Sequence, residues 1–265
     1  MNIERLRNIR CFLFDMDGTV YLGDQLLPGA KEFLAYLTSQ DIPYYFLTNN
    51  SSRSRVDYVK KLNHLGIPAT ANQIFTSGEA TGIYLNDKKP GASLYVVGTP
   101  SLEEELRSFG FQLVEEDPDY IVLGFDTTLT YAKLWKFCDF VRAGLPYLAT
   151  HPDINCPTET GFMPDIGAMM ALISASTGRD ADIIIGKPNT PIIEAVMRKT
   201  GYSIQDLGMV GDRLYTDIAL GQTGIATVLV LSGETKIEDL AESPFKPDIV
   251  VDHLHALHQF MKGNN

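Results

Sequence analysis

The chain has 265 residues, enough for one large core or two modest domains, and its 45% hydrophobic and 21% charged residues are ordinary for a soluble globular protein. Its formal net charge of -11 disfavours a nucleic-acid partner, because phosphate backbones are recognised by positive surfaces. The N-terminal sequence lacks the apolar core of a signal peptide, and no apolar run approaches the roughly 20 residues that span a bilayer, so we expect a cytoplasmic protein without a membrane partner.

Short apolar runs alternate with amphipathic stretches along the whole chain. The runs that end in polar or turn residues predict strands at 11–14, 44–47, 207–210 and 226–231. Helical periodicity predicts helices at 29–39, 53–65, 191–200 and 216–222. Strands that alternate with helices indicate an α/β fold whose parallel sheet is covered on both faces.

The middle of the chain repeats the same rhythm as a second unit. It predicts strands at 94–97, 120–123 and 147–149, with helices near 102–109 and 131–141. We interpret Trp135 and Phe137 as the apolar face of the second of these helices. Because this stretch offers no comparable polar strand ends, we expect an inserted domain at about 86–164, between core segments 1–85 and 165–265.

Polar residues follow the predicted core strands. Asp15, Thr48 and Asp212 each stand at a strand end, and the carboxyl ends of parallel strands share one edge of a sheet. The carboxylates of Asp15 and Asp17 would repel each other by on the order of 4 kcal/mol at about 4 Å. A cation offsets this repulsion, and Mg²⁺ prefers oxygen ligands. We therefore predict that Asp15, Asp17 and Asp212 bind Mg²⁺ and that Asp217 holds these ligands in place.

The same strand ends offer donors for a phosphoryl group. Thr48 has a hydroxyl, Asn49 an amide and Lys187 an ammonium. An aspartate nucleophile would form an acyl phosphate, and a second aspartate would protonate the leaving oxygen and then activate water. We predict these catalytic roles for Asp15 and Asp17. The alternative is structural, because Asp-Gly and Asn-Asn pairs also form turns and a lysine before proline is commonly a surface residue.

Four segments, taken in order, resemble the motifs of the haloacid-dehalogenase superfamily. They are Asp-Met-Asp-Gly-Thr at 15–19, Thr-Asn-Asn at 48–50, Lys187, and Gly-Asp-Arg-Leu-Tyr-Thr-Asp at 211–217. The Thr-Asn-Asn and Gly-Asp-Arg-Leu forms are similar to those of the branch with 4-nitrophenylphosphatase-like enzymes and sugar-phosphate phosphatases. The resemblance spans almost the entire chain and lacks no motif residue.

The resemblance implies a Rossmann-like parallel-sheet core with an inserted α/β cap. It implies that Asp15 is the nucleophile and a Mg²⁺ ligand, and that Asp17 is the acid/base and binds Mg²⁺ through its backbone carbonyl. Asp212 would complete the protein ligands, supported by Asp217.

The phosphoryl group would be bound, on the same resemblance, by Thr48 and Lys187, with Asn49 and Asn50 nearby. The family also places a substrate-contacting loop at 151–157, where Asn155 and Cys156 are the candidates against an ordinary loop.

We therefore expect Mg²⁺-dependent hydrolysis of small phosphate monoesters, namely sugar phosphates, glycerol phosphate, phosphoglycolate, nucleoside monophosphates or pyridoxal phosphate. The partner would be a small phosphorylated metabolite, and because caps of this branch can mediate dimers, a homodimer is compatible with the sequence. Two alternatives remain open here. A phosphomutase would use the same aspartates, and a non-catalytic phosphate-binding protein would need a degraded site, against which the intact motifs argue.

Overall fold

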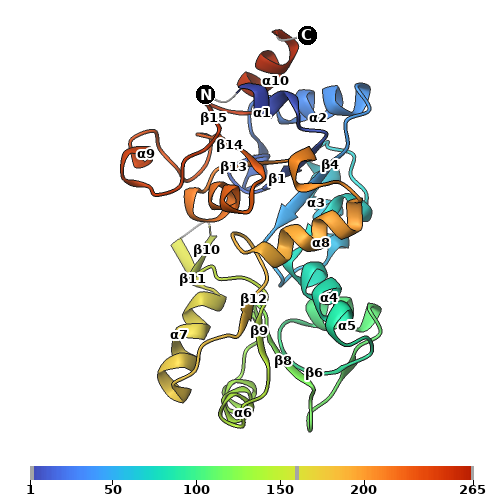
Figure 1. Ribbon diagram of the computed structural model, residues 1–265, viewed down its shortest axis with the longest axis vertical. Coiled ribbons are helices and arrows are strands. Elements are labelled where there is room, and N and C mark those ends of the chain that lie inside the picture. The colour runs from blue at the N-terminus through green and yellow to red at the C-terminus, as the bar shows by residue number, and fades with distance from the viewer. Residues whose placement is uncertain (1–2, 159–160, 264–265) are drawn as a thin grey trace. The chain divides into compact units, whose positions relative to one another are not determined.

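The computed structural model describes residues 3–158 and 161–263. They form two compact units, and Figure 1 labels most of their helices and strands. The first unit comprises Met1–Thr48, Val56–Phe75 and Val196–Asn265, and the second comprises Asn49–Arg55 and Thr76–Ala195. The range expected for the insertion, 86–164, lies inside the second unit, which extends further at both ends.

A six-stranded sheet in the order β15-β14-β13-β1-β4-β5 forms the centre of the first unit. The strands are β1 (Cys11–Phe14), β4 (Tyr44–Thr48), β5 (Ile74–Thr76), β13 (Leu207–Gly211), β14 (Ala226–Val230) and β15 (Ile249–Val251). Strand β1 pairs in parallel with both β13 and β4, so that Phe14 lies opposite Val210 and Phe46. The carboxyl ends of these three strands therefore meet at one edge, as the sequence predicts.

Helices and short turns complete the first unit. They are α1 (Ile3–Arg7), α2 (Ala30–Ser39), α3 (Arg55–His64), α9 (Asp239–Glu242), α10 (Leu254–Gly263), the 3₁₀ turns Ala71–Gln73 and Ile204–Asp206, and the hairpin of β2 (Tyr21–Leu22) and β3 (Gln25–Leu26). Helix α8 (Thr190–Thr200) runs across the division between the units. Helix α2 buries Phe33, and α10 lies beside it in Figure 1, with the His258 ring 5.8 Å from the Phe33 ring.

The segment expected to be helical at 216–222 is helical, but it is not an α-helix. A π-helical turn, Leu214–Ile218, is followed there by a 3₁₀ helix, Ala219–Thr223. The backbone N–H groups of Asp217 and Ile218 both donate to the Arg213 carbonyl, each at 3.1 Å, and the Asp217 carboxylate accepts from the Arg213 N–H at 3.1 Å. The wide turn thus folds Asp217 back toward strand β13, where a Cβ on Gly211 would lie 2.3 Å from the Asp217 Cβ.

The second unit has its own parallel sheet, with five strands in the order β12-β9-β8-β6-β7. Its strands are β6 (Ser93–Val97), β7 (Gln112–Leu113), β8 (Tyr120–Leu123), β9 (Tyr147–Ala149) and β12 (Ile183–Ile184), and β10 (Asn155–Thr158) and β11 (Gly161–Pro164) form a separate hairpin. Its helices are α4 (Ser77–Lys88), α5 (Pro100–Ser108), α6 (Tyr131–Arg142) and α7 (Ile166–Thr177). The expected α/β class with a parallel-sheet core is confirmed.

Helix α6 differs from its interpretation in one respect. Phe137 is fully buried, whereas Trp135 is 62% exposed. Two positions apart on a helix correspond to a rotation of about 200°, so these residues face opposite sides. The idea that both form one apolar face was wrong.

The segment 49–55 follows β4 in sequence but packs within the second unit. The Ser51 hydroxyl accepts a hydrogen bond from the Phe125 N–H at 3.0 Å. Arg55 forms ion pairs of 3.2 Å with both Glu79 and Glu105, two largely buried carboxylates. The division between the units therefore falls immediately after β4.

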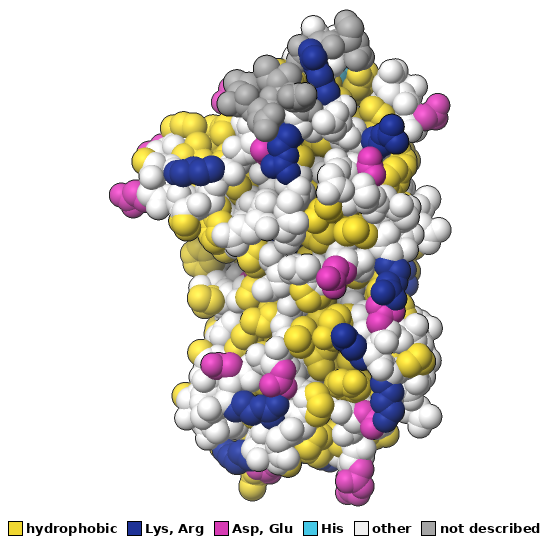
Figure 2. Space-filling view, in the orientation of Figure 1, with side chains coloured by type: hydrophobic (Ala, Val, Ile, Leu, Met, Phe, Trp, Pro, Cys, Tyr) yellow, Lys and Arg dark blue, Asp and Glu magenta, His cyan; other side chains and the backbone are white. Residues whose placement is uncertain are grey.

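Charged side chains of both signs share the face drawn in Figure 2, where Lys and Arg stand among Asp and Glu. This arrangement forms no continuous basic area on that face of the described residues. Among the described residues, no helix has the length and apolar character needed to cross a membrane.

Candidate active site

Three aspartates of the first unit come together beyond the sheet edge. Asp15 directly follows β1, Asp212 directly follows β13, and Asp217 lies in the π-helical turn. One carboxylate oxygen of each lies within 4.8 Å of the others. The N–H of Asp15 donates to the Val210 carbonyl at 2.9 Å, which extends the β1–β13 pairing by one residue and fixes where the carboxylate begins.

The close approach of the three carboxylates shifts the pKa of Asp212. Its burial raises the pKa of its carboxyl, and the negative charges of Asp15 and Asp217 raise that pKa further. One oxygen, Oδ2, accepts a hydrogen bond from the Glu234 N–H at 2.7 Å. The other, Oδ1, is buried and has no hydrogen-bond donor among the described residues. Clustered carboxylates with an orphaned oxygen fit a divalent cation, which prefers oxygen ligands.

The backbone approaches Asp212 closely from two sides. A Cβ on Gly18 would lie 2.3 Å from Asp212 Oδ2, and a Cβ on Gly233 would lie 2.0 Å from the same atom. Gly18 also has a φ of +83°, a conformation that L side chains rarely adopt. Glycine is therefore required at position 18, both by space and by backbone conformation.

Asp17 and Thr48 occupy different positions relative to this cluster. The Asp17 side chain is exposed and does not belong to the group of three carboxylates, while its backbone forms a bridge with Tyr21. Thr48 is the buried last residue of β4, the strand next to β1. The expected catalytic role of Asp17 and the expected phosphoryl contact of Thr48 stay predictions.

Arg213 supplies positive charge beside the carboxylates. Its guanidinium forms a 2.9 Å ion pair with Glu234, whose other oxygen accepts from the Tyr215 hydroxyl at 2.8 Å. Burial alone would lower the pKa of Arg213, but its attraction to Asp15 and the other nearby acidic groups outweighs burial and raises that pKa. The arginine is thus an ion-pair partner of the acidic groups around it.

Lys187 and Asn49 meet in the second unit. Lys187 is 2% exposed, and its backbone N–H donates to Asn49 Oδ1 at 2.8 Å. Asn49 Nδ2 returns a hydrogen bond to the Lys187 carbonyl at 3.0 Å. Asn50 instead forms a local turn, because its side-chain oxygen accepts from both the N–H and the hydroxyl of Ser52 at 2.8 Å.

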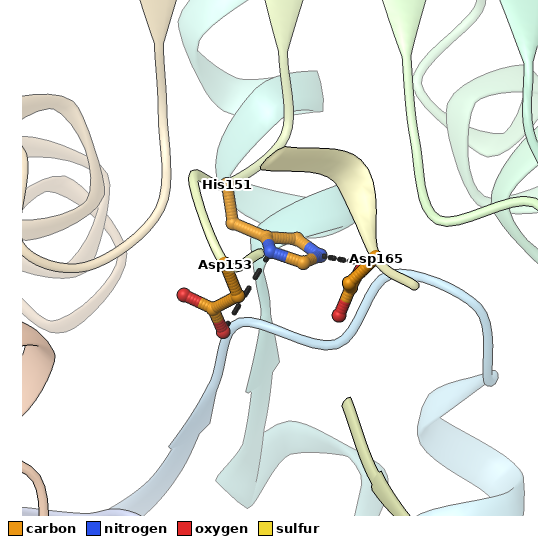
Figure 3. A group of neighbouring side chains, drawn as sticks. All are labelled: His151, Asp153 and Asp165. Carbon is orange, nitrogen blue, oxygen red and sulfur yellow. Dashed lines mark ion pairs between the residues drawn. The ribbon is translucent and has the colours of Figure 1, made fainter. Parts of the chain in front are cut away.

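A buried histidine between two aspartates is a feature that the sequence did not predict. Figure 3 shows His151 Nδ1 facing Asp153, at 3.7 Å from Oδ2, and Nε2 facing Asp165, at 3.6 Å from Oδ1. One ligand atom of each residue lies within 4.8 Å of the others. The two ring nitrogens face different carboxylates. We interpret the group as an imidazole–carboxylate cluster.

Each member of this cluster has its own electrostatic compensation. Burial lowers the pKa of His151 to about 4, against the attraction of Asp153 and together with the repulsion of Lys187, so the ring is neutral at neutral pH. Asp153 accepts from Asn49 Nδ2 at 3.0 Å, and Asp165 accepts from the Ile166 N–H at 2.7 Å at the start of α7. An aspartate before an apolar helix signals such a cap, but nothing local signals its contact with His151.

Asn155 and Cys156 are neighbours in β10, so their side chains point to opposite faces of the hairpin. Asn155 is exposed, whereas Cys156 is partly buried and packs against the core of the second unit. One pocket cannot receive both side chains. The substrate contacts of both residues stay predictions. The Asn155 side chain is the more accessible of the two.

Two family models match the chain. The model described as haloacid dehalogenase-like hydrolase matches residues 12–112, and the one described as HAD-hydrolase-like matches residues 184–257. The first includes the segments with Asp15 and Thr48, and the second includes Lys187 and Asp212. All four sequence motifs thus fall within the matched ranges.

Similar proteins match over nearly their whole length. The 5'-nucleotidase YutF of Bacillus subtilis is 36% identical over 94% of this chain and 97% of its own. An acid sugar phosphatase of Staphylococcus haemolyticus is 36% identical over 91% of this chain and 92% of its own. The crystal structure of a 4-nitrophenylphosphatase from Thermotoga maritima superposes with a TM-score of 0.93 and 46% identity, covering 96% of this chain and 98% of that one.

Proposed function

Because the chain belongs to the haloacid dehalogenase-like hydrolase family and is a phosphoric monoester hydrolase, we propose that it cleaves small phosphate monoesters with Mg²⁺ through an aspartyl-phosphate on Asp15. The observation that carries this proposal is the cluster of Asp15, Asp212 and Asp217 with its orphaned Asp212 oxygen. A nucleophile beside a cation site at a sheet edge suits phosphoryl transfer, in which positioning and charge neutralisation dominate.

The first half of the reaction breaks the ester. A carboxylate oxygen of Asp15 attacks phosphorus, and the bond between phosphorus and the ester oxygen breaks. Asp17, protonated at this stage, gives its proton to the leaving oxygen, so the product leaves as an alcohol. The exposed position of the Asp17 side chain supports this role, because it can reach a leaving group without joining the carboxylate cluster.

The second half releases phosphate. Asp17, now ionised, takes a proton from water as the water oxygen attacks phosphorus, and the bond from phosphorus to Asp15 breaks. Orthophosphate leaves, and both aspartates return to their starting states.

A bound metal ion and the residues around it would assist both halves of the reaction. The side chains of Asp15 and Asp212 and the backbone carbonyl of Asp17 would hold Mg²⁺, which supplies positive charge to the phosphoryl oxygens when bound. We assign the Thr48 hydroxyl and the Lys187 ammonium as donors to those oxygens. Asp217, held by the Arg213 N–H, would keep the other carboxylates in place.

The substrate class follows from the relatives' names. They are called 5'-nucleotidase, acid sugar phosphatase and 4-nitrophenylphosphatase. We therefore propose nucleoside monophosphates and sugar phosphates as the first candidates, with glycerol phosphate and phosphoglycolate next. We also propose that the second unit, which includes the range 86–164, is the cap.

The test measures orthophosphate released from a panel of these monoesters with Mg²⁺. Release should require the metal and should disappear with a chelator or in Asp15→Asn. A chemical quench should trap a hydroxylamine-sensitive phosphoryl group on the wild type and none on Asp15→Asn. Equal release by Asp15→Asn would sink the mechanism, and an isomeric product without free phosphate would indicate a mutase.

A further inference from the structure

We propose that the side-chain amide of Asn49 is a positioning group for Lys187 and makes no contact of its own with the phosphoryl group. This inference rests on the proposed function, in which Lys187 is a phosphoryl donor. It replaces the phosphate-ligand role that the sequence motif gives Asn49.

Two hydrogen bonds join the amide to one residue. Asn49 Oδ1 accepts from the Lys187 N–H at 2.8 Å, and Asn49 Nδ2 donates to the Lys187 carbonyl at 3.0 Å. A single hydrogen bond would allow the lysine backbone to pivot, whereas two bonds from a planar amide fix its orientation. The amide also sits against the preceding residue, because a Cβ on Gly186 would lie 2.6 Å from Asn49 Oδ1.

The amide has no donor left for a phosphoryl oxygen. A side-chain amide carries two N–H bonds. Asn49 Nδ2 uses them on the Lys187 carbonyl and on Asp153 Oδ1, each at 3.0 Å. Phosphoryl oxygens are acceptors, so a contact with this side chain would have to break one of these bonds. Because Asn49 is 5% exposed, breaking a bond would also cost a hydrogen bond in a largely buried setting.

Asn49 is itself held in place on both sides. Its backbone carbonyl accepts a hydrogen bond from the Ser77 hydroxyl at the start of α4. Asp153, on the other side of the amide, faces the buried His151. A fixed amide can transmit this rigidity to the backbone of Lys187, from which the flexible side chain extends.

A double-mutant cycle tests this role. The clamp involves only backbone atoms of Lys187, so Lys187→Ala removes the ammonium and keeps both hydrogen bonds from Asn49. We expect Asn49→Ala to lower kcat/KM by roughly 10- to 100-fold, in line with a misplacement of about 1 Å. Lys187→Ala should lower it further, and the double variant should match Lys187→Ala within about threefold. Inhibition by orthophosphate should weaken in the same non-additive pattern.

A different outcome of the cycle would contradict the positioning role of Asn49. If the two losses multiply in the double variant, Asn49 acts independently of Lys187 and the proposal fails. A merely structural role would lower the melting temperature of both backgrounds without this dependence on the ammonium, so Tm is measured for all four proteins. If Asn49→Ala does not fold, Asn49→Ser takes its place in the cycle.

Two controls separate this inference from the function on which it rests. Asn63, an exposed asparagine whose Oδ1 accepts from the Ala69 N–H at 3.1 Å, is the matched control, and Asn63→Ala should keep full activity. A wild type without Mg²⁺-dependent phosphate release would overturn the proposed function and this inference with it. An active wild type whose cycle is multiplicative would overturn only the role of Asn49.

Discussion

Two acidic clusters in this protein solve the same electrostatic problem in different ways. In the first unit, Asp15, Asp212 and Asp217 bring three carboxylates within 4.8 Å, and one buried oxygen of Asp212 has no donor among the described residues. In the second unit, Asp153 and Asp165 flank His151, and each accepts a hydrogen bond from an N–H group.

The difference lies in what completes each cluster. In the second, each acid accepts from an N–H group and faces a neutral imidazole, whose two ring nitrogens are buried without a hydrogen-bond partner among the described residues. In the first, Arg213 lies beside the acids, yet burial and the negative charges of Asp15 and Asp217 still raise the pKa of Asp212. A buried carboxylate oxygen without a donor among the described residues suits a cation, whereas acids that accept N–H groups and face an imidazole suit a structural brace.

The largest expected effect is on catalysis in the first cluster. Asp15→Asn removes the nucleophile but keeps the size of the side chain, and we expect activity to fall by more than about 1,000-fold. Initial rates of orthophosphate release measure this. Asp139→Asn, at an exposed carboxylate paired with Arg142, is the control and should retain full activity. A comparable loss in that control would point to a general defect.

Metal binding should produce the next largest effect. At a Mg²⁺ concentration of about 1,000 times its dissociation constant, linkage stabilises the wild type by about 4 kcal/mol. Without metal, Asp212→Asn should be more stable than the wild type, because it removes a buried charge. With Mg²⁺ the order should reverse. Thermal melts of both proteins, with and without metal, decide this, and a Mg²⁺ response in the variant equal to that of the wild type would contradict it.

The second cluster should respond to pH instead of metal. His151 has a folded pKa of about 4, below the unfolded value of about 6.5, so the unfolded chain binds more protons between these values. Stability from this group is therefore lost as pH falls from about 6.5 to 4, by up to about 3 kcal/mol. Urea melts at pH 7 and 4.5 should show a smaller loss for His151→Gln than for the wild type. Identical losses would show that His151 does not titrate in this way.

The smallest effect should come from the exposed rim of the first cluster. Glu234→Gln weakens the contacts with Arg213 and Tyr215, and the Glu234 side chain is 45% exposed. Because surface pairs of this kind contribute little, we expect a loss of less than about 1 kcal/mol. Its backbone N–H, which donates to Asp212, is unchanged, so Mg²⁺ binding should persist. A large loss of Mg²⁺ response would show that the rim controls the cluster.

Much of the first cluster could be predicted from the sequence because its information is local. Asp15 and Asp212 directly follow apolar strands, and the parallel order of a sheet places such ends together. Strands β1, β4, β13 and β14 were predictable for the same reason, whereas β5, β15 and helix α7 lie outside the predicted elements. The π-helical turn at Leu214–Ile218 was not, since its widening depends on the Arg213 carbonyl accepting two N–H groups.

The second cluster could not be predicted because its contacts are distant in sequence. Asp165 follows β11, which pairs antiparallel with β10, and it faces His151 from 14 positions away in sequence. The Asn49 amide binds Lys187 across 138 positions. The amide of Asn49 after a strand predicts a phosphoryl donor, because residue types alone do not show which hydrogen bonds are already made.

The division of the units immediately after β4 has a consequence for how this protein can be recombined. The segment 49–55 belongs by its packing to the second unit although 20 residues of the first unit, Val56–Phe75, separate it from Thr76. A chimaera that exchanges only the continuous stretch 76–195 would leave behind Asn49, Ser51 and Arg55. The hydrogen bonds and ion pair that these residues form with the second unit would then depend on residues of another sequence. The second unit therefore consists of two separate pieces of chain. A functional chimaera has to take both pieces from the same donor sequence.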